Sequence, residues 1–243
     1  MVELEQETFH EKELKRWWGS FSCKDQAYIK LFLGDATSVF CTSLDWHLLE
    51  AITTCWDPAL RCITICEVDL VPTLEEYDCF LALSTLVSWV YQPPVRTSYC
   101  KRLAKLLSLK RLVDETLTQY RNGLGGSMPF DFLFDWFRST KCPVAYWEDF
   151  VDLKEHWVSY RCQAFMVAFF GTVLFPSQLG SISFAILPLV STLPHSISFV
   201  PALLSETVRS LSLCCETGSG RLGCCVHLLQ LWFCSHLSMI ARA

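Results

Sequence analysis

The sequence lacks an uninterrupted apolar segment long enough to cross a membrane, although residues 163–205 carry no formal charge. A spanning helix needs roughly 20 continuous apolar residues. Pro176, Pro188, Pro194 and Pro201 interrupt the uncharged stretch, and its best piece, AFMVAFFGTVLF, has the length of a buried core helix. We therefore expect no membrane span, and membrane association through 163–205 stays open as an alternative.

The sequence also lacks an excess of basic residues. It has 20 Lys and Arg against 25 Asp and Glu, a net charge of −5, so it offers no overall electrostatic attraction for nucleic acid. A local basic helix face remains at Lys101, Arg102 and Lys105, whose spacing suits phosphate contacts. Because Asp114 and Glu115 follow closely, we expect nucleic-acid binding there to be weak and sensitive to salt.

The N-terminus lacks the apolar core of a secretory signal, since MVELEQETFHEKELKRWW alternates acids and bases. We expect a nuclear or cytoplasmic protein, not a secreted one. Residues 1–24 should form a charged N-terminal helix or tail that buries little. Without an oxidising compartment, the 14 cysteines are expected to be thiols, most of them small buried residues.

Catalytic motifs are incomplete. Ser98-Tyr99-Cys100-Lys101 matches the S-x-x-K pattern of serine acyl enzymes, but no Lys-Thr-Gly accompanies it. The acids of the stretch 75–78 are explained by the dipole of the helix that begins there. We therefore predict no catalytic residue and no cofactor.

The densest group of candidate metal ligands comprises Cys214, Cys224, Cys225 and His227. Zinc favours two pairs of ligands around a tetrahedral ion. Adjacent cysteines on a helix point about 100° apart, so each pair offers one convenient ligand. Buried thiols beside a loop are the preferred interpretation, and an enzyme with an unrecognised Cys/His or metal site remains the alternative.

Helical periodicity covers most of the chain, whereas β-branched alternation appears once, in RCITICEVDLV (61–71). The fold class we predict is mainly α, a single multi-helix domain over 25–243 with one short β-hairpin near 61–71. The hairpin should turn near Cys66–Glu67 and form the only sheet. The helices are expected at 25–33, 43–56, from Thr73 onward, and at 97–123, 130–137, 146–174, 199–215 and 221–241.

The helix that starts at Thr73 has a clear beginning. Pro72 closes the preceding strand, Thr73 is placed to cap the helix, and Glu76 occupies the reciprocal position of a capping box. Leu74 is expected to face the core. The C-terminal helix 221–241 is expected to pack on 165–175 and 184–204. It should leave apolar surface uncovered, which predicts a protein partner or self-association.

Three stretches resemble the plant mobile domain family. ITICEVDLVPTLEEYDCFLAL (63–83) resembles its hairpin-then-helix signature, FFGTVLFPSQLGSISFAILPLV (169–190) its Leu-Phe-Pro segment, and GCCVHLLQLWFCSHL (223–237) its Leu-Gln-Leu-Trp helix. The residues that carry the resemblance are Pro72, Thr73, Leu74, Glu75, Glu76, Phe175, Pro176, Leu229, Gln230, Leu231 and Trp232.

The resemblance implies a mostly helical, non-enzymatic interaction module of plant mobile-element origin, with relatives that act in nuclear genome or transposon silencing. Its nearest relatives would be uncharacterised, retrotransposon-associated plant proteins. They continue past the Leu-Gln-Leu-Trp helix, so the chain is expected to be incomplete at its C-terminus. The family's "aminotransferase-like" label is not carried over, because a pyridoxal enzyme normally has a large α/β sheet and this sequence has too few strands.

Overall fold

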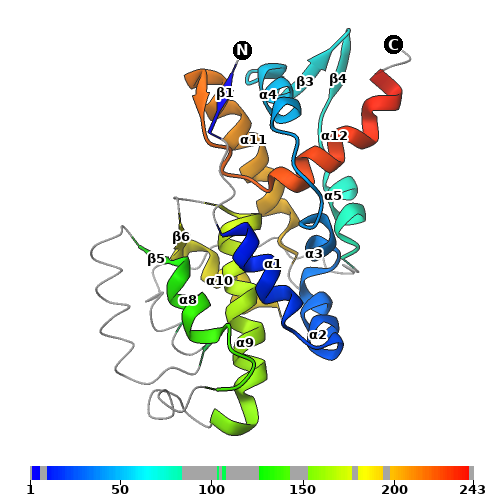
Figure 1. Cartoon of the computed structure of the whole chain (residues 1–243). Coiled ribbons are helices and arrows are strands. Elements are labelled where there is room, and N and C mark those ends of the chain that lie inside the picture. The colour runs from blue at the N-terminus through cyan, green and yellow to red at the C-terminus, as the bar shows by residue number, and fades with distance from the viewer. Residues whose placement is uncertain are drawn as a thin grey trace.

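A computed structural model describes residues 2–5, 10–83, 103, 106–107, 126–142, 153–176, 180–193 and 198–240. The chain forms a mainly α-helical single domain with small sheets, as the sequence predicts. Figure 1 shows two ends of this domain: one is built around α9 (Leu153–Phe169), the other around α11 (Val200–Thr217) and α12 (Val226–Ile240).

Helix α9 is the centre of the first end. It contacts α8 (Phe130–Phe137), α1 (Glu11–Gly19), α2 (Cys23–Leu33) and α10 (Leu187–Thr192), and it continues into a π-helical turn, η2 (Phe170–Leu174). Residues 164–171 are all buried. The predicted helix is therefore confirmed over 153–174, with its second half covered on every side, as expected of a helix that is apolar all round.

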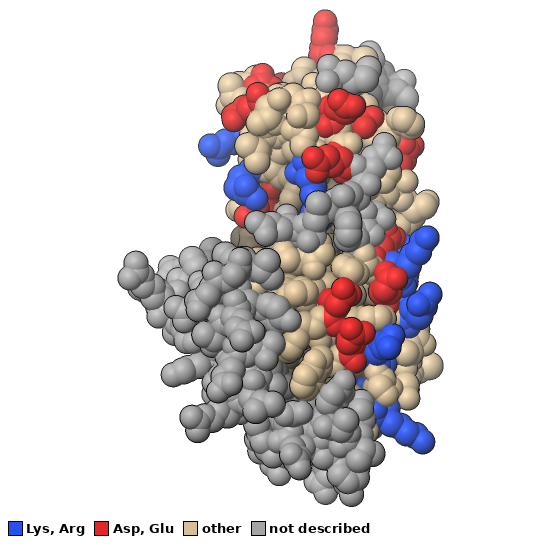
Figure 2. Space-filling model, turned by 60° about the vertical axis from the view of Figure 1, so that its left-hand side comes forward, with Lys and Arg blue, Asp and Glu red and all other residues tan. Residues whose placement is uncertain are grey.

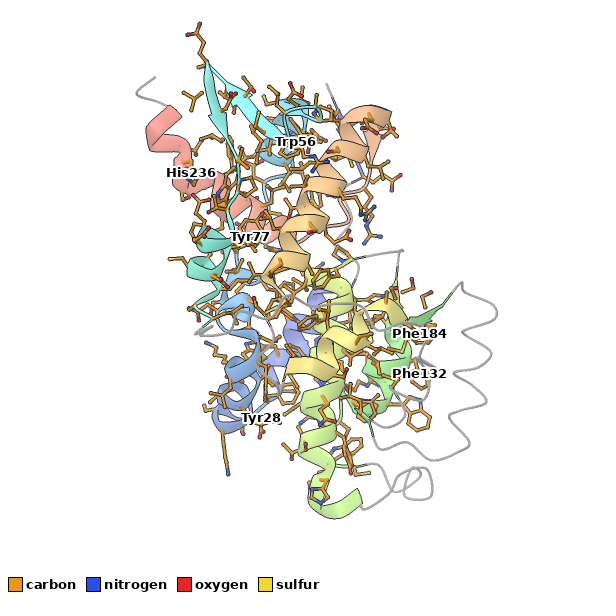
Figure 3. All side chains as sticks on the ribbon, turned by 180° about the vertical axis from the view of Figure 1, so that it is seen from behind. Tyr28, Trp56, Tyr77, Phe132, Phe184 and His236 are labelled. Atoms are coloured by element: carbon orange, nitrogen blue, oxygen red, sulfur yellow. The ribbon has the colours of Figure 1, made fainter. Side chains whose placement is uncertain are left out.

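Helices α11 and α12 organise the second end. Both contact α5 (Leu74–Leu81) and α4 (Trp46–Thr54), and α12 also contacts α3 (Ala36–Val39). In Figure 3, Trp56, Tyr77 and His236 lie at this end, whereas Phe132 and Phe184 lie at the other. The expectation that α12 packs chiefly on 165–175 and 184–204 is wrong. Those segments pack on one another instead, as the 5.1 Å between the Phe170 and Phe199 rings illustrates.

The predicted hairpin is present and turns at Cys66–Glu67. Strand β3 (Cys62–Ile65) pairs with β4 (Val68–Leu70) on one side and with β2 (Trp56–Asp57) on the other, in antiparallel register. Cys66 and Glu67 have φ of 48° and 65°. A two-residue loop with both φ positive is the turn whose twist matches a hairpin.

The prediction of a single sheet is wrong. Strand β5 (Ser127–Pro129) pairs with β6 (Ser181–Ser183), and β1 (Glu3–Leu4) pairs with β7 (Ser219–Gly220). The short 3₁₀ turn η3 (Phe184–Ile186) follows β6. Ladders of two or three residues are too short for an alternating pattern to reveal.

The N-terminal segment is also more buried than its charge predicts. Leu14 and Trp17 are almost fully buried, and the Trp17 ring packs edge-on against Phe165 of α9 at 5.6 Å. A spacing of three residues places Leu14 and Trp17 on one helix face, so the charged residues occupy the other. Helix α1 is therefore part of the core rather than a solvated tail.

Candidate functional site

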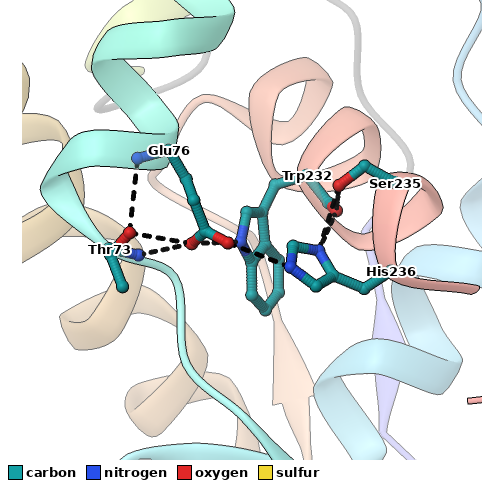
Figure 4. A network of polar contacts seen from close by, with 5 residues as sticks. All are labelled: Thr73, Glu76, Trp232, Ser235 and His236. Atoms are coloured by element: carbon teal, nitrogen blue, oxygen red, sulfur yellow. Dashed lines mark hydrogen bonds and ion pairs between the residues drawn. The ribbon is translucent and has the colours of Figure 1, made fainter. Parts of the chain in front are cut away.

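The first and last sequence motifs meet where α5 contacts α12 (Figure 4). Oε2 of Glu76 accepts hydrogen bonds from the backbone N–H of Thr73 at 2.9 Å, the Thr73 hydroxyl at 2.9 Å and the Trp232 indole N–H at 3.0 Å. Oε1 lies 2.9 Å from Nε2 of His236. The Glu76 N–H donates to Thr73 Oγ1 at 3.3 Å, so the predicted capping box is confirmed.

These contacts keep Glu76 ionised. Burial acts to raise the pKa of its carboxyl group, but the hydrogen bonds from Thr73 and Trp232 and the electrostatic interaction with His236 outweigh burial and lower the pKa below its ordinary value of 4.5. Nδ1 of His236 lies 2.9 Å from the Trp232 carbonyl oxygen. The Ser235 hydroxyl lies 3.0 Å from the same nitrogen, so both ring nitrogens of His236 have polar partners. The network therefore joins α5 and α12 through contacts of Glu76, Trp232 and His236.

The remaining motif residues near this junction also have structural roles. Gln230 joins α12 to the loop before α4: its Nε2 donates to the Ser43 carbonyl at 2.8 Å, and its Oε1 accepts from the Asp45 N–H at 2.7 Å. Leu229 is buried and Leu231 is half-buried, while Pro72 is buried and Glu75 is exposed.

Leu74 corrects a prediction. It was expected to face the core, yet it is 40% exposed. Tyr77 and Leu81, three and seven residues further along α5, are fully buried. The apolar stripe of α5 therefore enters the core only after the first turn, where Leu74 lies.

The Leu-Phe-Pro segment ends the π-helical turn. The Phe175 N–H donates to the Phe170 carbonyl at 2.7 Å, and the two rings stack at 5.9 Å. Gly171 lies within this turn, and a Cβ there would come within 2.4 Å of Ile182 Cγ2, so η2 and β6 approach closely. Pro176 follows and lines a cavity. Single π-turns within helices often mark functional sites.

The candidate metal ligands do not gather around one point. Cys214, Cys224 and Cys225 are buried, and burial raises the pKa of each thiol, to about 11 for Cys225. Protonated thiols are poor nucleophiles and poor ligands. In the part of the chain that the structure describes, no group of three or more His, Cys, Asp or Glu side chains could hold a metal ion.

His227 belongs to a small cavity instead. The cavity has a volume of about 50 Å³ and is lined by α1, η2 and the start of α12. That volume holds about three or four water molecules. The polar side chains that line it include Glu11, Thr172, Arg221 and His227, and Pro176 forms part of the wall.

The His227 ring is buried without a hydrogen-bond partner. Only 4% of the residue is exposed, and within the described ranges neither ring nitrogen has a partner. The nearest charged atom recorded is Oε1 of Glu11, 3.9 Å from Nε2, and Glu11 is itself paired with Lys15. Burial lowers the pKa of His227 to about 4, Glu11 acts to raise it and Lys15 to lower it. The ring is therefore neutral at pH 7.

A second concave surface runs along α11. It is an open groove of about 720 Å³ between α11 and the segments that flank β3 and β4, and we call it the α11 groove. Val71 and Leu213 line it and are each half exposed. Arg61, Val208 and Arg209 line it as well. Arg209 is paired with Glu206 at 2.6 Å. Glu216 lines it too, so the groove combines apolar side chains with charges of both signs.

The basic residues Lys101, Arg102 and Lys105 lie outside the described residues. On the face drawn in Figure 2, acidic and basic side chains are interspersed. Mixed charges of this kind produce no extended field of one sign. The described surface in that view therefore adds no argument for nucleic-acid binding.

Several polar residues of these sites had no signal in the sequence. His236 lies two and a half turns from His227 on the same helix, and only the fold places it beside Glu76. The sequence around Glu11 is charged and predicts a solvated side chain, and the sequence around Arg221 predicts a glycine-rich turn. Glu76 could be identified as a cap, but not as the partner of Trp232, 156 positions away.

Among the described residues, no helix is long and apolar enough to cross a membrane.

Comparison with known proteins identifies the family of the chain. No match was found among curated proteins or among solved structures. The model of a family described as a domain of unknown function (DUF7745) matches residues 22–242, which is most of the chain. The chain therefore belongs to the DUF7745 family.

Proposed function

We propose that the chain is a non-enzymatic interaction module that binds a protein partner through the α11 groove. The observation that carries this proposal is the exposure of Val71 and Leu213, which both line an open groove of about 720 Å³. Large apolar side chains gathered around a concave surface are typical of protein-binding sites. The paired carboxylate of Glu76 and the protonated buried thiols agree with a module that performs no chemistry at these positions.

The chemistry of the groove indicates what kind of segment fits it. Arg61 lines the groove and makes no ion pair with any described residue, whereas Arg209 is already paired with Glu206. An acidic side chain of the partner can therefore pair with Arg61 without displacing an existing contact. We infer a partner segment that carries apolar side chains next to an Asp or Glu.

The sequence motifs support a proposal about the origin of the module. The resemblance to the plant mobile domain supports a mobile-element origin and a role in nuclear genome or transposon silencing. In this proposal the capped helix α5 and the helix α12 form the scaffold, and the α11 groove faces the partner. A nuclear location is part of the same proposal.

The test is selection of peptides from a random displayed library on the purified full chain, followed by measurement of their affinity in solution. We expect enrichment of sequences with apolar residues beside an acid. Leu213→Asp should weaken their binding at least tenfold, because a carboxylate in the groove removes apolar contact and repels the partner's acid. Leu31→Asp is the matched control: Leu31, on α2, is 78% exposed and lies outside the groove.

Other occupants are outcomes of the same test. Light scattering after size exclusion would detect a dimer. A dimer that Leu213→Asp dissociates would replace the partner segment with a second copy of the chain. Selected peptides that bind the wild type and Leu213→Asp equally well would show that the groove is not the docking surface.

A further inference from the structure

The His227 cavity contains a polar group that the fold leaves unsatisfied. A buried polar atom without a hydrogen bond costs free energy, and native structures contain few of them. His227 presents two such atoms, Nδ1 and Nε2, in a ring that lines the cavity and is 4% exposed. A neutral imidazole offers one donor and one acceptor. An acceptor in the cavity would satisfy the ring nitrogen that carries the proton.

The charges around the cavity favour an anion. Glu11 is the negative side chain nearest to His227, and Lys15 neutralises it from one turn further along α1. Glu5 also lines the cavity, but its side chain is exposed and therefore screened by water. Arg221 contributes a guanidinium group, and the cavity adjoins the N-terminus of α12, a helix of 15 residues. Guanidinium groups and helix N-termini both favour oxyanions.

We propose that this cavity binds a small oxyanion, a carboxylate or inorganic phosphate, with the Arg221 guanidinium and the His227 ring as its hydrogen-bond donors. The cavity's volume of about 50 Å³ matches this class. Three or four water molecules occupy about the same space as the four oxygens of phosphate or as a short carboxylic acid. This site is separate from the α11 groove, so the proposal does not depend on the proposed partner.

The experiment follows the histidine rings of the full chain by NMR. Two-bond ¹H–¹⁵N correlation spectra of protein labelled in histidine are recorded during titration with sodium phosphate or, separately, sodium acetate, at fixed pH and ionic strength. We expect the ring signals of His227, assigned with His227→Gln, to shift and saturate in the millimolar range. The signals of His236 should stay in place, because its two nitrogens already have partners.

Variants test the donors. Arg221→Gln should weaken the binding of the anion at least tenfold. Arg138→Gln, which removes an exposed guanidinium at the end of α8, should leave the affinity for the anion unchanged. The tighter of the two anions identifies the class. Shifts of His227 that fail to saturate for both anions, or an affinity that a folded Arg221→Gln retains, would overturn the proposal. If Arg221→Gln does not fold, the contrast between His227 and His236 in the wild type still decides.

Discussion

Two histidines of α12 meet opposite environments. His236 is held by Glu76 at 2.9 Å and by the Trp232 carbonyl at 2.9 Å, so both of its ring nitrogens have partners. His227 lies at the other end of the helix with no hydrogen-bond partner among the described residues, and the nearest carboxylate recorded is 3.9 Å away. One histidine joins two helices, while the other lines a small cavity without a hydrogen bond.

The difference shows that one end of α12 stabilises the fold and that the other end destabilises it. The network around Glu76 satisfies every polar atom that it buries, and networks of that kind fix a unique packing. The unpaired ring of His227 destabilises the fold until something binds it. Changes at the paired end of α12 should therefore be costly, and removal of the unpaired imidazole should be tolerated.

Among changes to α12, the largest effect is expected from Trp232→Ala, at the paired end. The indole is fully buried and also donates to Glu76. Loss of a buried aromatic side chain costs about 3–5 kcal/mol of unfolding free energy. Trp232→Phe keeps most of the volume and removes the donor, so we expect a loss of about 1–2 kcal/mol. Urea unfolding measures the free energy of unfolding of both variants. Equal losses would show that the lost hydrogen bond, and not the lost side-chain volume, accounts for the destabilisation.

The next largest effect is a pH dependence of the free energy of unfolding, caused by the unpaired ring of His227. The pKa of His227 is about 4 in the folded state against 6.5 when unfolded, because burial disfavours the charged ring. The unfolded chain therefore binds the extra proton first, and stability should fall as the pH drops from 6.5 to 4, by at most about 3 kcal/mol. The titratable or charged groups around the ring are Glu5, His10, Glu11, Lys15, Arg221 and Cys224.

Replacement of the His227 ring separates the pH dependence that comes from His227 from the pH dependence that comes from Glu76. His227→Gln should remove the loss between pH 6.5 and 4 in urea unfolding. It should leave intact the loss below pH 4.5 that comes from Glu76, whose lowered pKa makes it stabilising only while ionised. An unchanged slope above pH 4.5 in His227→Gln would assign that slope to other groups.

A smaller effect is expected from the cap of α5. Thr73→Ala removes the hydroxyl that accepts from the Glu76 N–H and donates to its carboxylate. Loss of an N-cap side chain costs about 1 kcal/mol. Thr73→Ser keeps the hydroxyl and should stay close to the wild type in thermal unfolding. If the alanine and serine variants melted together, the cap would not contribute to stability.

Local features of this fold could be predicted from the sequence, whereas contacts between distant segments could not. The capping box of Thr73 and Glu76 and the turn at Cys66–Glu67 depend on neighbouring residues, and both were found. The burial of Trp17 in a charged helix depends on where α9 lies. The same holds for the candidate sites: Glu76 was identified, but its partners Trp232 and His236 are long-range.

The residues of the His227 cavity could likewise not be predicted to lie together, because they are far apart in the sequence. His227 was identified as a candidate ligand through its cysteine neighbours, yet it faces Glu11 and Arg221 rather than a metal site. Glu11 and His227 come from opposite ends of the chain, and no periodicity links them. The expectation that most cysteines are buried is wrong for the described residues: Cys162, Cys214, Cys224 and Cys225 are buried, but Cys79 and Cys234 are exposed although their sequence neighbours are apolar. Apolar neighbours in the sequence do not decide which face of a helix a cysteine occupies.

The smallest effect is expected at Leu74, where the fold reverses the expectation from the sequence. Leu74 is 40% exposed at the first position of α5, so Leu74→Asp loses little apolar contact. A carboxylate in the first turn also interacts favourably with the helix dipole, by about 0.3–1 kcal/mol. The two terms nearly cancel, and the melting temperature should stay close to that of the wild type. Leu81→Asp, at the fully buried end of the same helix, should instead prevent folding, because it buries an unpaired charge. A large loss for Leu74→Asp would mean that a partner or a second copy covers this residue in solution.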